Sequence, residues 1–203
     1  MSGTNVGVFT PIVLQAENYS ALVLAQDPDA NSTMVRDASN KESNTDLNAT
    51  GGLRPGFSGS GYLDFGTDGG DTVSYVVAVA QAGSYDLNIR YASVGDRPLM
   101  LGVGDAGPAI RFNFPTTGPG TGDFAKQGFN VWKFVTSTVT LAAGENVITL
   151  AIPPGVTQGP NLDRLEVTAA GTGPVPSDTS ADADNNLALV GPAAAVKAAT
   201  AIS

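Results

Sequence analysis

Short segments of alternating apolar and polar residues constrain the fold of this chain more than any other feature of its sequence. In the segment 85–91 the odd-numbered residues are Tyr, Leu, Ile and Tyr, whereas the even-numbered ones are Asp, Asn and Arg. The odd-numbered residues of 73–79 are likewise Val, Tyr, Val and Val. Successive side chains of a strand point to opposite faces, so both segments indicate strands with one buried and one wet face. No segment between residues 12 and 168 shows a helical period.

The turn-forming residues support the same fold class. Glycine and proline contribute 25 and 13 of the 203 residues, and they separate short β runs. We predict strands at 12–17, 62–65, 72–79, 85–92, 99–103, 109–114, 131–141, 146–152 and 162–168, and a further short one at 33–36. Hairpin-like connections between so many short strands predict an all-β protein, a β-sandwich jelly roll of two antiparallel sheets.

Composition divides the chain into three parts. Residues 1–10 are a loose lead-in, residues 11–169 form the β domain, and residues 170–203 are rich first in Pro, Ser and Asp and then in Ala. We interpret this last part as a linker or tail, either disordered or ending in a short docked helix. The loops 37–60 and 115–128 are long and polar, which is typical of loops that bind something or are disordered.

Residue usage excludes several kinds of chemistry. The chain has no Cys and no His, which excludes disulfides, His- or thiolate-ligated metals and Ser-His-Asp triads. A net charge of −9 disfavours nucleic acids and anionic lipids as partners, and no apolar run is long enough for a membrane span. The first ten residues do not resemble a signal peptide, so we expect either a cytosolic protein or a mature chain. The acidic, cysteine-free β composition favours a secreted or cell-surface protein.

Three oxygen-bearing side chains lie at the two ends of the predicted domain. Gln15 and Glu17 share a face of the first strand with Val13, and Asp163 shares one with Leu165 of the last strand. This parity predicts that all three point inward, where a polar side chain needs a partner. Such a set suits a hard cation such as calcium, which takes six to eight oxygen ligands. The alternative is that Glu17 pairs with an arginine, Arg164, or caps backbone amides.

An ordered series of motifs resembles carbohydrate-binding module families 6 and 35. The segment 15–19 (QAENY) resembles their opening motif, and matching pieces follow in order over residues 11–168. These pieces are 59–65 (GSGYLDF), 71–75 (DTVSY), 82–92 (AGSYDLNIRYA), 97–99 (RPL), 141–148 (LAAGENVI) and 160–165 (PNLDRL). The resemblance implies a galactose-binding-domain-like jelly roll that is usually attached to a secreted polysaccharide-degrading enzyme.

The resemblance also implies a structural calcium ion. Its ligand positions correspond to Gln15, Glu17 and Asp163, together with backbone carbonyls of the loop that follows the second strand. The family often has Glu at the position of Gln15. An amide oxygen still coordinates calcium, but with one negative charge fewer the site is expected to bind more weakly.

The same resemblance implies a sugar-binding cleft built by loops at one end of the sandwich, where an aromatic ring stacks on the sugar. Asn161 matches the family's amide position, and Phe129 stands where a platform Trp is usual. Trp132 occupies a second aromatic position, although it could equally be a core or rim residue. We expect Phe129 to be exposed. Further ligand-contact candidates are Tyr62, Arg97 and Arg36, with a salt bridge to Asp96 or another acid as the alternative for Arg97.

These observations predict a non-catalytic module that targets an enzyme to a polysaccharide. Catalysis by a carboxylate pair is disfavoured because the chain has only four Glu residues and no evident acid pair in the cleft. The alternative is a structural or adhesion module of a surface protein that binds no sugar. We expect a polysaccharide or oligosaccharide partner and fusion to a catalytic domain in the full-length protein.

Overall fold

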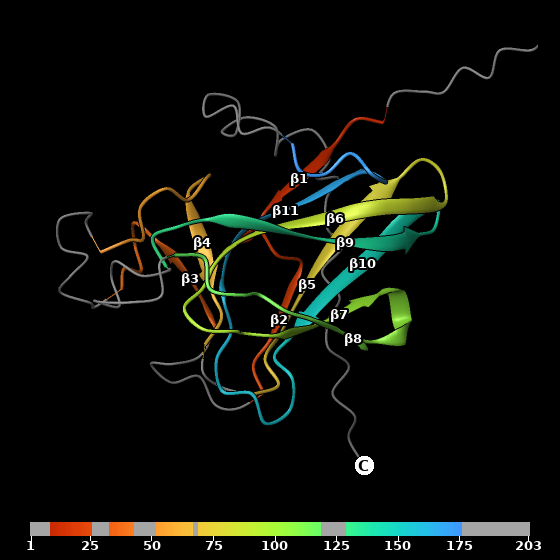
Figure 1. Cartoon of the computed structure of the whole chain (residues 1–203). Coiled ribbons are helices and arrows are strands. Elements are labelled where there is room, and N and C mark those ends of the chain that lie inside the picture. The colour runs from red at the N-terminus through yellow and green to blue at the C-terminus, as the bar shows by residue number, and fades with distance from the viewer. Residues whose placement is uncertain (1–8, 26–32, 43–51, 67–68, 119–128, 176–203) are drawn as a thin grey trace, which may run out of the picture.

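The computed structural model describes residues 9–25, 33–42, 52–66, 69–118 and 129–175. These residues form eleven strands and one short 3-10 helix, with no α-helix among them (Figure 1). The elements are β1 (Ile12–Gln15), β2 (Ala21–Val23), β3 (Met34–Asp37), β4 (Gly61–Asp64), β5 (Thr72–Val79), β6 (Gly83–Ala92), β7 (Leu99–Val103), η2 (Gly104–Ala106), β8 (Ile110–Phe112), β9 (Lys133–Leu141), β10 (Gly144–Ala151) and β11 (Asn161–Ala169). In the described part of the chain, no helix is long and apolar enough to span a membrane.

The strands form two antiparallel sheets, which confirms the predicted fold class. The larger sheet has the order β3-β4-β11-β6-β9, with β1 also paired to β11, and the smaller one has the order β2-β5-β10-β7-β8. The bounds predicted for β5 and β7 coincide with those observed. β2 is absent from the strands predicted from the sequence, because its three residues are too few to show an alternating pattern.

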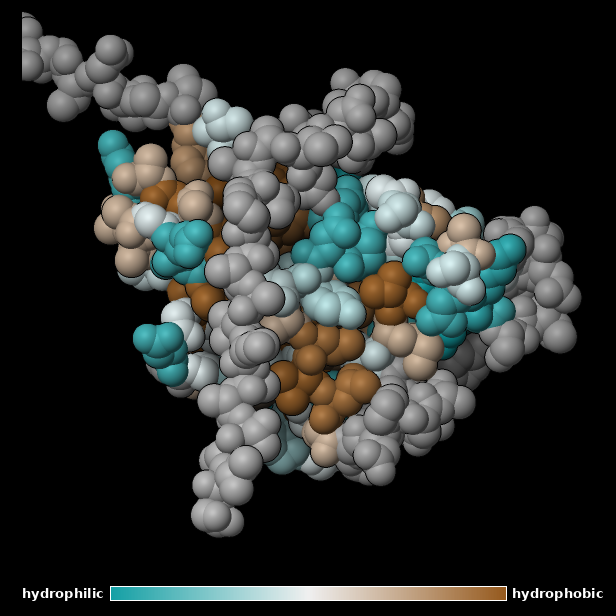
Figure 2. All heavy atoms as spheres, turned by 180° about the vertical axis from the view of Figure 1, so that it is seen from behind, coloured by the Kyte–Doolittle hydropathy of each residue, from teal (hydrophilic) through white to brown (hydrophobic). Residues whose placement is uncertain are grey.

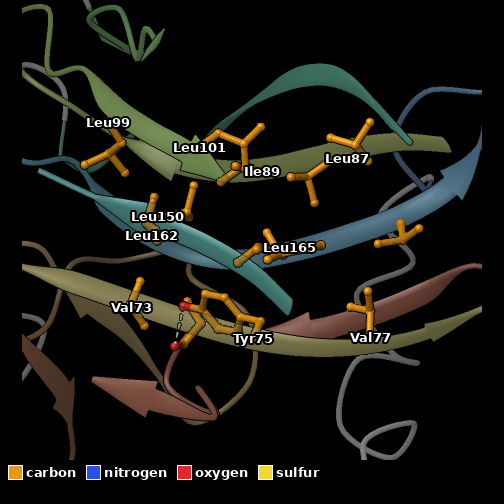
Figure 3. Packing of buried hydrophobic residues seen from close by; sticks show 14 of the residues in the cluster. Val73, Tyr75, Val77, Leu87, Ile89, Leu99, Leu101, Leu150, Leu162 and Leu165 are labelled. Carbon is orange, nitrogen blue, oxygen red and sulfur yellow. Dashed lines mark hydrogen bonds between the residues drawn. The ribbon is translucent and has the colours of Figure 1, made fainter. Parts of the chain in front are cut away.

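The core lies between the two sheets. Figure 3 shows Val73, Tyr75 and Val77 of β5 pointing toward leucines and isoleucines of the other strands, and all three are at most 2% exposed. The alternation found in the sequence therefore gives the inner face of β5, and likewise that of β6. The one polar atom of this group, the Tyr75 hydroxyl, donates to the carbonyl of Ala16 at 2.9 Å, so that burying it leaves no unpaired donor.

Two parity arguments from the sequence are wrong. In β1, Ile12 and Leu14 pack against the core, while Gln15 pairs with Arg164 on the opposite, outer face. In β11, the ladder to β6 shifts register between Leu162 and Arg164. Because of this bulge, Leu162 and Leu165 both reach the core. Asp163, the extra residue at the bulge, does not follow their alternation.

The outer face of the larger sheet is polar but buried. Asp86, Asn88 and Glu166 are at most 5% exposed. Main-chain amides that follow β11 satisfy the two carboxylates. Gly171 donates to Asp86 Oδ2 at 2.8 Å, and Val175 donates to Glu166 Oε2 at 2.6 Å. Residues 170–175, which the sequence analysis assigned to the linker or tail, are thus packed against the domain; the rest of that segment lies outside the described residues.

Other parts of the surface differ in character. At the N-terminal side the ring of Phe9 lies 5.0 Å from that of Tyr85, so the end of the predicted lead-in packs on the sandwich. Residues 1–8 lie outside the described part.

On the outer face of the smaller sheet, Val76 and Val147 pair across β5 and β10 and are 42% and 38% exposed. The molecule seen from behind carries apolar groups bordered by hydrophilic ones (Figure 2).

The segment 170–175 predicts a sharp difference between two truncations. A chain ending at Val175 keeps the amides that bond Asp86 and Glu166, whereas a chain ending at Ala169 loses them. Hydrogen bonds to charged groups each contribute about 1.5–3 kcal/mol, part of which water restores at the uncovered carboxylates. We expect the shorter chain to lose about 1–3 kcal/mol of unfolding free energy in urea denaturation relative to the chain ending at Val175. Equal midpoints for the two truncations would contradict this role.

Candidate functional site

Gln15, Glu17 and Asp163 come together at one junction of the larger sheet. On one side of β11, β1 pairs with Arg164 to Val167, and β4 pairs with Asn161 and Leu162. Asp163, at the bulge, lies opposite the gap between these two strands, and its carbonyl accepts the Ala16 amide at 2.9 Å. We call Gln15, Glu17 and Asp163 the oxygen cluster.

The segment from Ser58 to Gly61 joins the three members of the oxygen cluster. Ser58 donates from its amide to Asp163 Oδ1 at 2.6 Å and from its hydroxyl to Asp163 Oδ2 and Gln15 Oε1. Glu17 Oε1 accepts the amides of Ser60 and Gly61, each at 3.1 Å. The alternative that Glu17 caps backbone amides is therefore observed, while the arginine considered as its partner, Arg164, pairs with Glu166 instead.

Burial makes the negative charge of this cluster costly. Desolvation raises the pKa of Glu17 above its ordinary value of 4.5, and the nearby charge of Asp163 raises it further. Desolvation also raises the pKa of Asp163, although Arg90 and the Ser58 donors oppose that shift. Glu17 Oε2 is buried and has no hydrogen-bond partner among the described residues. Ionised Glu17 therefore lacks a compensating group on one oxygen.

The oxygen cluster fits a hard cation. Its donors are carboxylate and amide oxygens, which calcium prefers, and one of them, Glu17 Oε2, is buried without a partner. Gly59 has a positive φ of 69°, and a Cβ there would lie 2.9 Å from Gln15 Oε1 and 3.0 Å from Glu17 Oε1, so only glycine fits. No group of three or more Asp or Glu residues with metal-binding geometry occurs in the described ranges, so a bound ion would have two carboxylates and would need carbonyl or water oxygens besides.

The predicted ligand-contact residues other than Asn161 form a second group beside the first. We call it the arginine–aromatic cluster: it contains the residues in contact around the rings of Tyr62, Phe129 and Trp132, together with the ion pair of Arg36 and Asp64, because Arg36 lies opposite Tyr62 in the ladder between β3 and β4. Its members are Arg36, Glu42, Arg54, Tyr62, Asp64, Arg97, Phe129 and Trp132.

A buried ion pair forms the centre of the arginine–aromatic cluster. Arg54 and Glu42 make a two-point contact, with Nη2–Oε2 at 2.7 Å and Nε–Oε1 at 3.1 Å, and both side chains are at most 10% exposed. The Tyr62 hydroxyl donates to the same Glu42 Oε1. Burial and the acceptor Glu42 both raise the pKa of Tyr62, so the hydroxyl stays protonated and serves as a donor.

Two predicted contact residues are more buried than the sequence analysis expected. Phe129 is only 6% exposed, so the expectation of an exposed platform is wrong. The guanidinium carbons of Arg54 and Arg97 lie 5.1 Å and 4.8 Å from its ring centroid, and these cation–π contacts occupy the ring. Tyr62 is fully buried, which contradicts direct ligand contact in this conformation; its ring packs against Trp132 at 5.6 Å.

The remaining candidates are nearer to solvent. Trp132 is half-buried, and its indole donates to the Pro55 carbonyl at 2.9 Å. Arg97 donates to the carbonyls of Val94 and Gly159, and desolvation lowers its pKa, which the charge of Asp64 partly offsets.

Arg36 and Asn161 flank the carboxylate of Asp64 on neighbouring strands. Arg36 pairs with Asp64 at 3.0 Å. Asn161 is buried and lies opposite Asp64 in the ladder between β4 and β11. Both candidates therefore lie at the same end of the larger sheet, Arg36 as a member of the cluster and Asn161 as a neighbour of its member Asp64.

Sequence reasoning missed four charged residues: Glu42, Arg54, Asp64 and Arg90. Arg54 lies in the polar loop 37–60, whose length is typical of loops that bind something or are disordered, so an arginine there in a chain with only ten basic residues is a usable signal. Arg90 was assigned to the wet face of its strand, but its partner Asp163 could not be found by alternation because of the bulge. Residues 43–51 and 119–128 of the two long loops lie outside the described residues.

Comparison with protein families gives one assignment. Residues 38–168, more than half of the chain, match the family model Endotoxin_C, whose description is delta endotoxin. The chain belongs to the Endotoxin_C family. The matched range contains the loop 115–128, all but the first residue of the loop 37–60, the whole arginine–aromatic cluster except Arg36, and Asp163 of the oxygen cluster.

This member of the Endotoxin_C family also shares its fold with family 35 carbohydrate-binding modules. It matches the native structure of such a module from Clostridium thermocellum with a TM-score of 0.57 and 22% identity, covering 80% of this chain and 100% of that one. At this identity the match establishes the fold alone. The resemblance stated from the sequence is thus supported at the level of the fold, whereas the family model that matches is Endotoxin_C.

Two curated relatives are much longer enzymes. The Endotoxin_C chain is 33% identical over 112 residues to an exo-beta-D-glucosaminidase of Amycolatopsis orientalis, covering 54% of this chain and 10% of that protein. It is 34% identical over 119 residues to a 1,6-alpha-glucosyltransferase of Sporosarcina globispora, covering 57% of this chain and 9% of that protein. The match therefore spans about a tenth of the length of either relative.

The contacts of Glu42 predict that the Tyr62 hydroxyl contributes more to the free energy of unfolding than a buried hydroxyl that donates to a neutral acceptor. Tyr62→Phe removes a donor to a buried carboxylate and should cost about 1.5–3 kcal/mol of unfolding free energy. Tyr91→Phe is the matched control: its hydroxyl donates to the neutral Pro115 carbonyl, and its loss should cost about 0.5–1.5 kcal/mol. Urea denaturation of both variants measures the difference, and a smaller loss in Tyr62→Phe than in Tyr91→Phe would contradict the assignment.

Proposed function

We propose that this chain is a non-catalytic carbohydrate-binding module, attached in its full-length protein to a polysaccharide-degrading enzyme that is secreted or on the cell surface. The observation that carries the proposal is the arginine–aromatic cluster. Arg36, Tyr62, Arg97, Phe129 and Trp132 come from separate segments of the sequence, and they are linked through Arg54 and Glu42 and through the pairing of β3 with β4. Guanidinium groups beside a half-exposed indole are suited to sugar hydroxyls and to the apolar face of a sugar ring.

The two curated relatives support a non-catalytic role. One is named as an exo-beta-D-glucosaminidase and the other as a 1,6-alpha-glucosyltransferase, so they catalyse different reactions on different linkages. Each match covers only about a tenth of the enzyme concerned, which favours an accessory segment over one that carries out either reaction. What both enzymes share is a carbohydrate substrate, and a shared accessory segment would serve its recognition.

We also propose that the oxygen cluster holds a structural calcium ion. Gln15, Glu17 and Asp163 would provide side-chain oxygens, and nearby carbonyls would complete the shell. When bound, the ion would neutralise the buried carboxylates and fix the segment 58–61, which contacts all three residues. No chemistry on the sugar is assigned to it.

The burial of Phe129 and Tyr62 favours one competing function, a structural or adhesion module that binds no sugar. With these rings enclosed, Trp132 is the one aromatic candidate that solvent reaches. Carbohydrate retention decides between the two functions.

The sugar-binding proposal predicts retention in native gels that contain polysaccharides, tested over a panel with calcium present. Arg97→Met removes a half-buried guanidinium from the arginine–aromatic cluster and should weaken binding about tenfold or more, since hydrogen bonds from charged groups contribute about 1.5–3 kcal/mol. Arg111→Met removes the same group from exposed β8 on the other sheet and should leave retention unchanged. A chain that no polysaccharide retains would support the adhesion alternative.

The calcium proposal predicts that a chelator lowers the melting temperature. An ion that binds only the folded state at a hundred- to thousand-fold excess over its Kd stabilises it by about 3–4 kcal/mol. Differential scanning calorimetry with calcium and with chelator measures this difference, and Glu17→Gln should reduce it strongly. An unchanged melting temperature in chelator would remove the metal from the proposal.

The same experiment has a defined pH dependence. The pKa of Glu17 is raised in the folded chain, so without metal the folded state prefers the protonated form, and the stability due to this group is lost as pH rises above 4.5. Calcium opposes that loss because it pairs with the ionised form. The stabilisation by calcium should therefore grow as pH rises above this value and decrease progressively as pH falls towards and below it.

A further inference from the structure

The loop from Arg54 to Gly61 touches both the oxygen cluster and the arginine–aromatic cluster. Its second half donates to the oxygen cluster through Ser58, Ser60 and Gly61. Its first half accepts from the other cluster: the Pro55 carbonyl accepts the Trp132 indole N–H at 2.9 Å. The two clusters are therefore joined by eight consecutive residues, of which both ends are held by side chains.

Arg90 makes the second connection between the two clusters. Its Nη1 lies 2.5 Å from Asp163 Oδ2, and its Nη2 donates to the Gly56 carbonyl at 3.0 Å. Its guanidinium carbon lies 5.8 Å from the ring centroid of Trp132. One planar cation thus contacts a member of the oxygen cluster, the connecting loop and the indole.

Arg90 supplies the positive charge next to a carboxylate that is completely enclosed. Asp163 is 0% exposed, while the Arg90 side chain is 18% exposed. A buried carboxylate needs a positive partner, and here the guanidinium fills that need on Oδ2. A divalent ion in the oxygen cluster would need the same carboxylate and would repel the guanidinium.

We propose that Arg90 is a positioning residue that transmits the occupancy of the oxygen cluster to Trp132. Without a cation, the Arg90 guanidinium neutralises Asp163, donates to the Gly56 carbonyl and lies beside the indole of Trp132. When a divalent cation binds Asp163, it weakens the hold of Arg90 on this carboxylate, and the environment of Trp132 changes. Because coupling is reciprocal, a ligand that fixes Arg90 at the indole changes the affinity for the cation by the same factor.

This inference rests on the calcium part of the proposed function but not on sugar binding. Trp132 is the sole tryptophan of the chain, so its fluorescence reports this position alone. We would titrate calcium into chelator-treated protein and follow both Trp132 emission and the melting temperature, with no sugar present. In the wild type we expect both to change and to saturate at the same calcium concentration.

Arg90→Met separates the inference from metal binding itself. It should still show a rise of melting temperature with calcium, larger than in the wild type because Asp163 is left unpaired in chelator, and a half-saturation at a few-fold lower calcium concentration. Its Trp132 emission should no longer respond. Arg111→Met, with the same change on exposed β8, should behave as the wild type in both measurements.

Arg90→Lys keeps the test valid if Arg90→Met does not fold. It retains the charge beside Asp163 but has no planar fork to reach Gly56 and the indole together, so its stability should be kept and its emission response lost. The proposal is overturned if calcium leaves wild-type emission unchanged, or if the Arg90 variants respond as the wild type does. Polysaccharide retention at saturating calcium is measured separately, so loss of sugar binding and loss of this coupling are distinguishable.

Discussion

The bulge in β11 is the constraint on which the arrangement of the site depends. By inserting one residue between Leu162 and Arg164, it keeps Leu162 and Leu165 in the core and leaves Asp163 free of their alternation. Asp163 then lies where β1 ends and β4 begins, within reach of Ser58 and Arg90. A regular strand would place every second residue of β11 on one face and could not supply both core leucines and this carboxylate.

Buried charges at this end of the sandwich are matched group by group. Glu42 is bonded to Arg54 and Tyr62, Asp163 to Arg90 and Ser58, and each of these contacts crosses between separate segments of the chain. Removing one partner of such a pair leaves an uncompensated charge, which is more costly than losing the pair as a whole. Two charged groups keep a buried atom without a hydrogen-bond partner in the described residues: Nη1 of Arg54 and Oε2 of Glu17. The Glu17 oxygen is an acceptor beside two further oxygen-bearing side chains, and this is the physical reason for proposing a cation there.

The two clusters share a loop, so the contacts that hold the oxygen cluster together also fix the position of the arginine–aromatic cluster. The segment Ser58–Gly61 is tied to the oxygen cluster, and Pro55 and Gly56 are tied to Trp132 and Arg90. A loop that is held at both ends is pre-organised, which lowers the entropic cost of ordering it when a ligand binds. This end of the larger sheet holds four of the ten basic residues of the acidic chain, namely Arg36, Arg54, Arg90 and Arg97.

The sequence by itself determined the fold class, the order of nearly all strands and the exclusion of cysteine and histidine chemistry, because alternation and turn residues are local properties. It also selected Gln15, Glu17 and Asp163 and most residues of the arginine–aromatic cluster. Only the tertiary structure decided which face these residues take, that Phe129 and Tyr62 are enclosed, and that Arg90 joins the two clusters. The reason is that these features depend on contacts between distant segments, such as the bond between Ser58 and Asp163 across 105 positions, and that a bulge such as the one in β11 interrupts the local alternation of its strand.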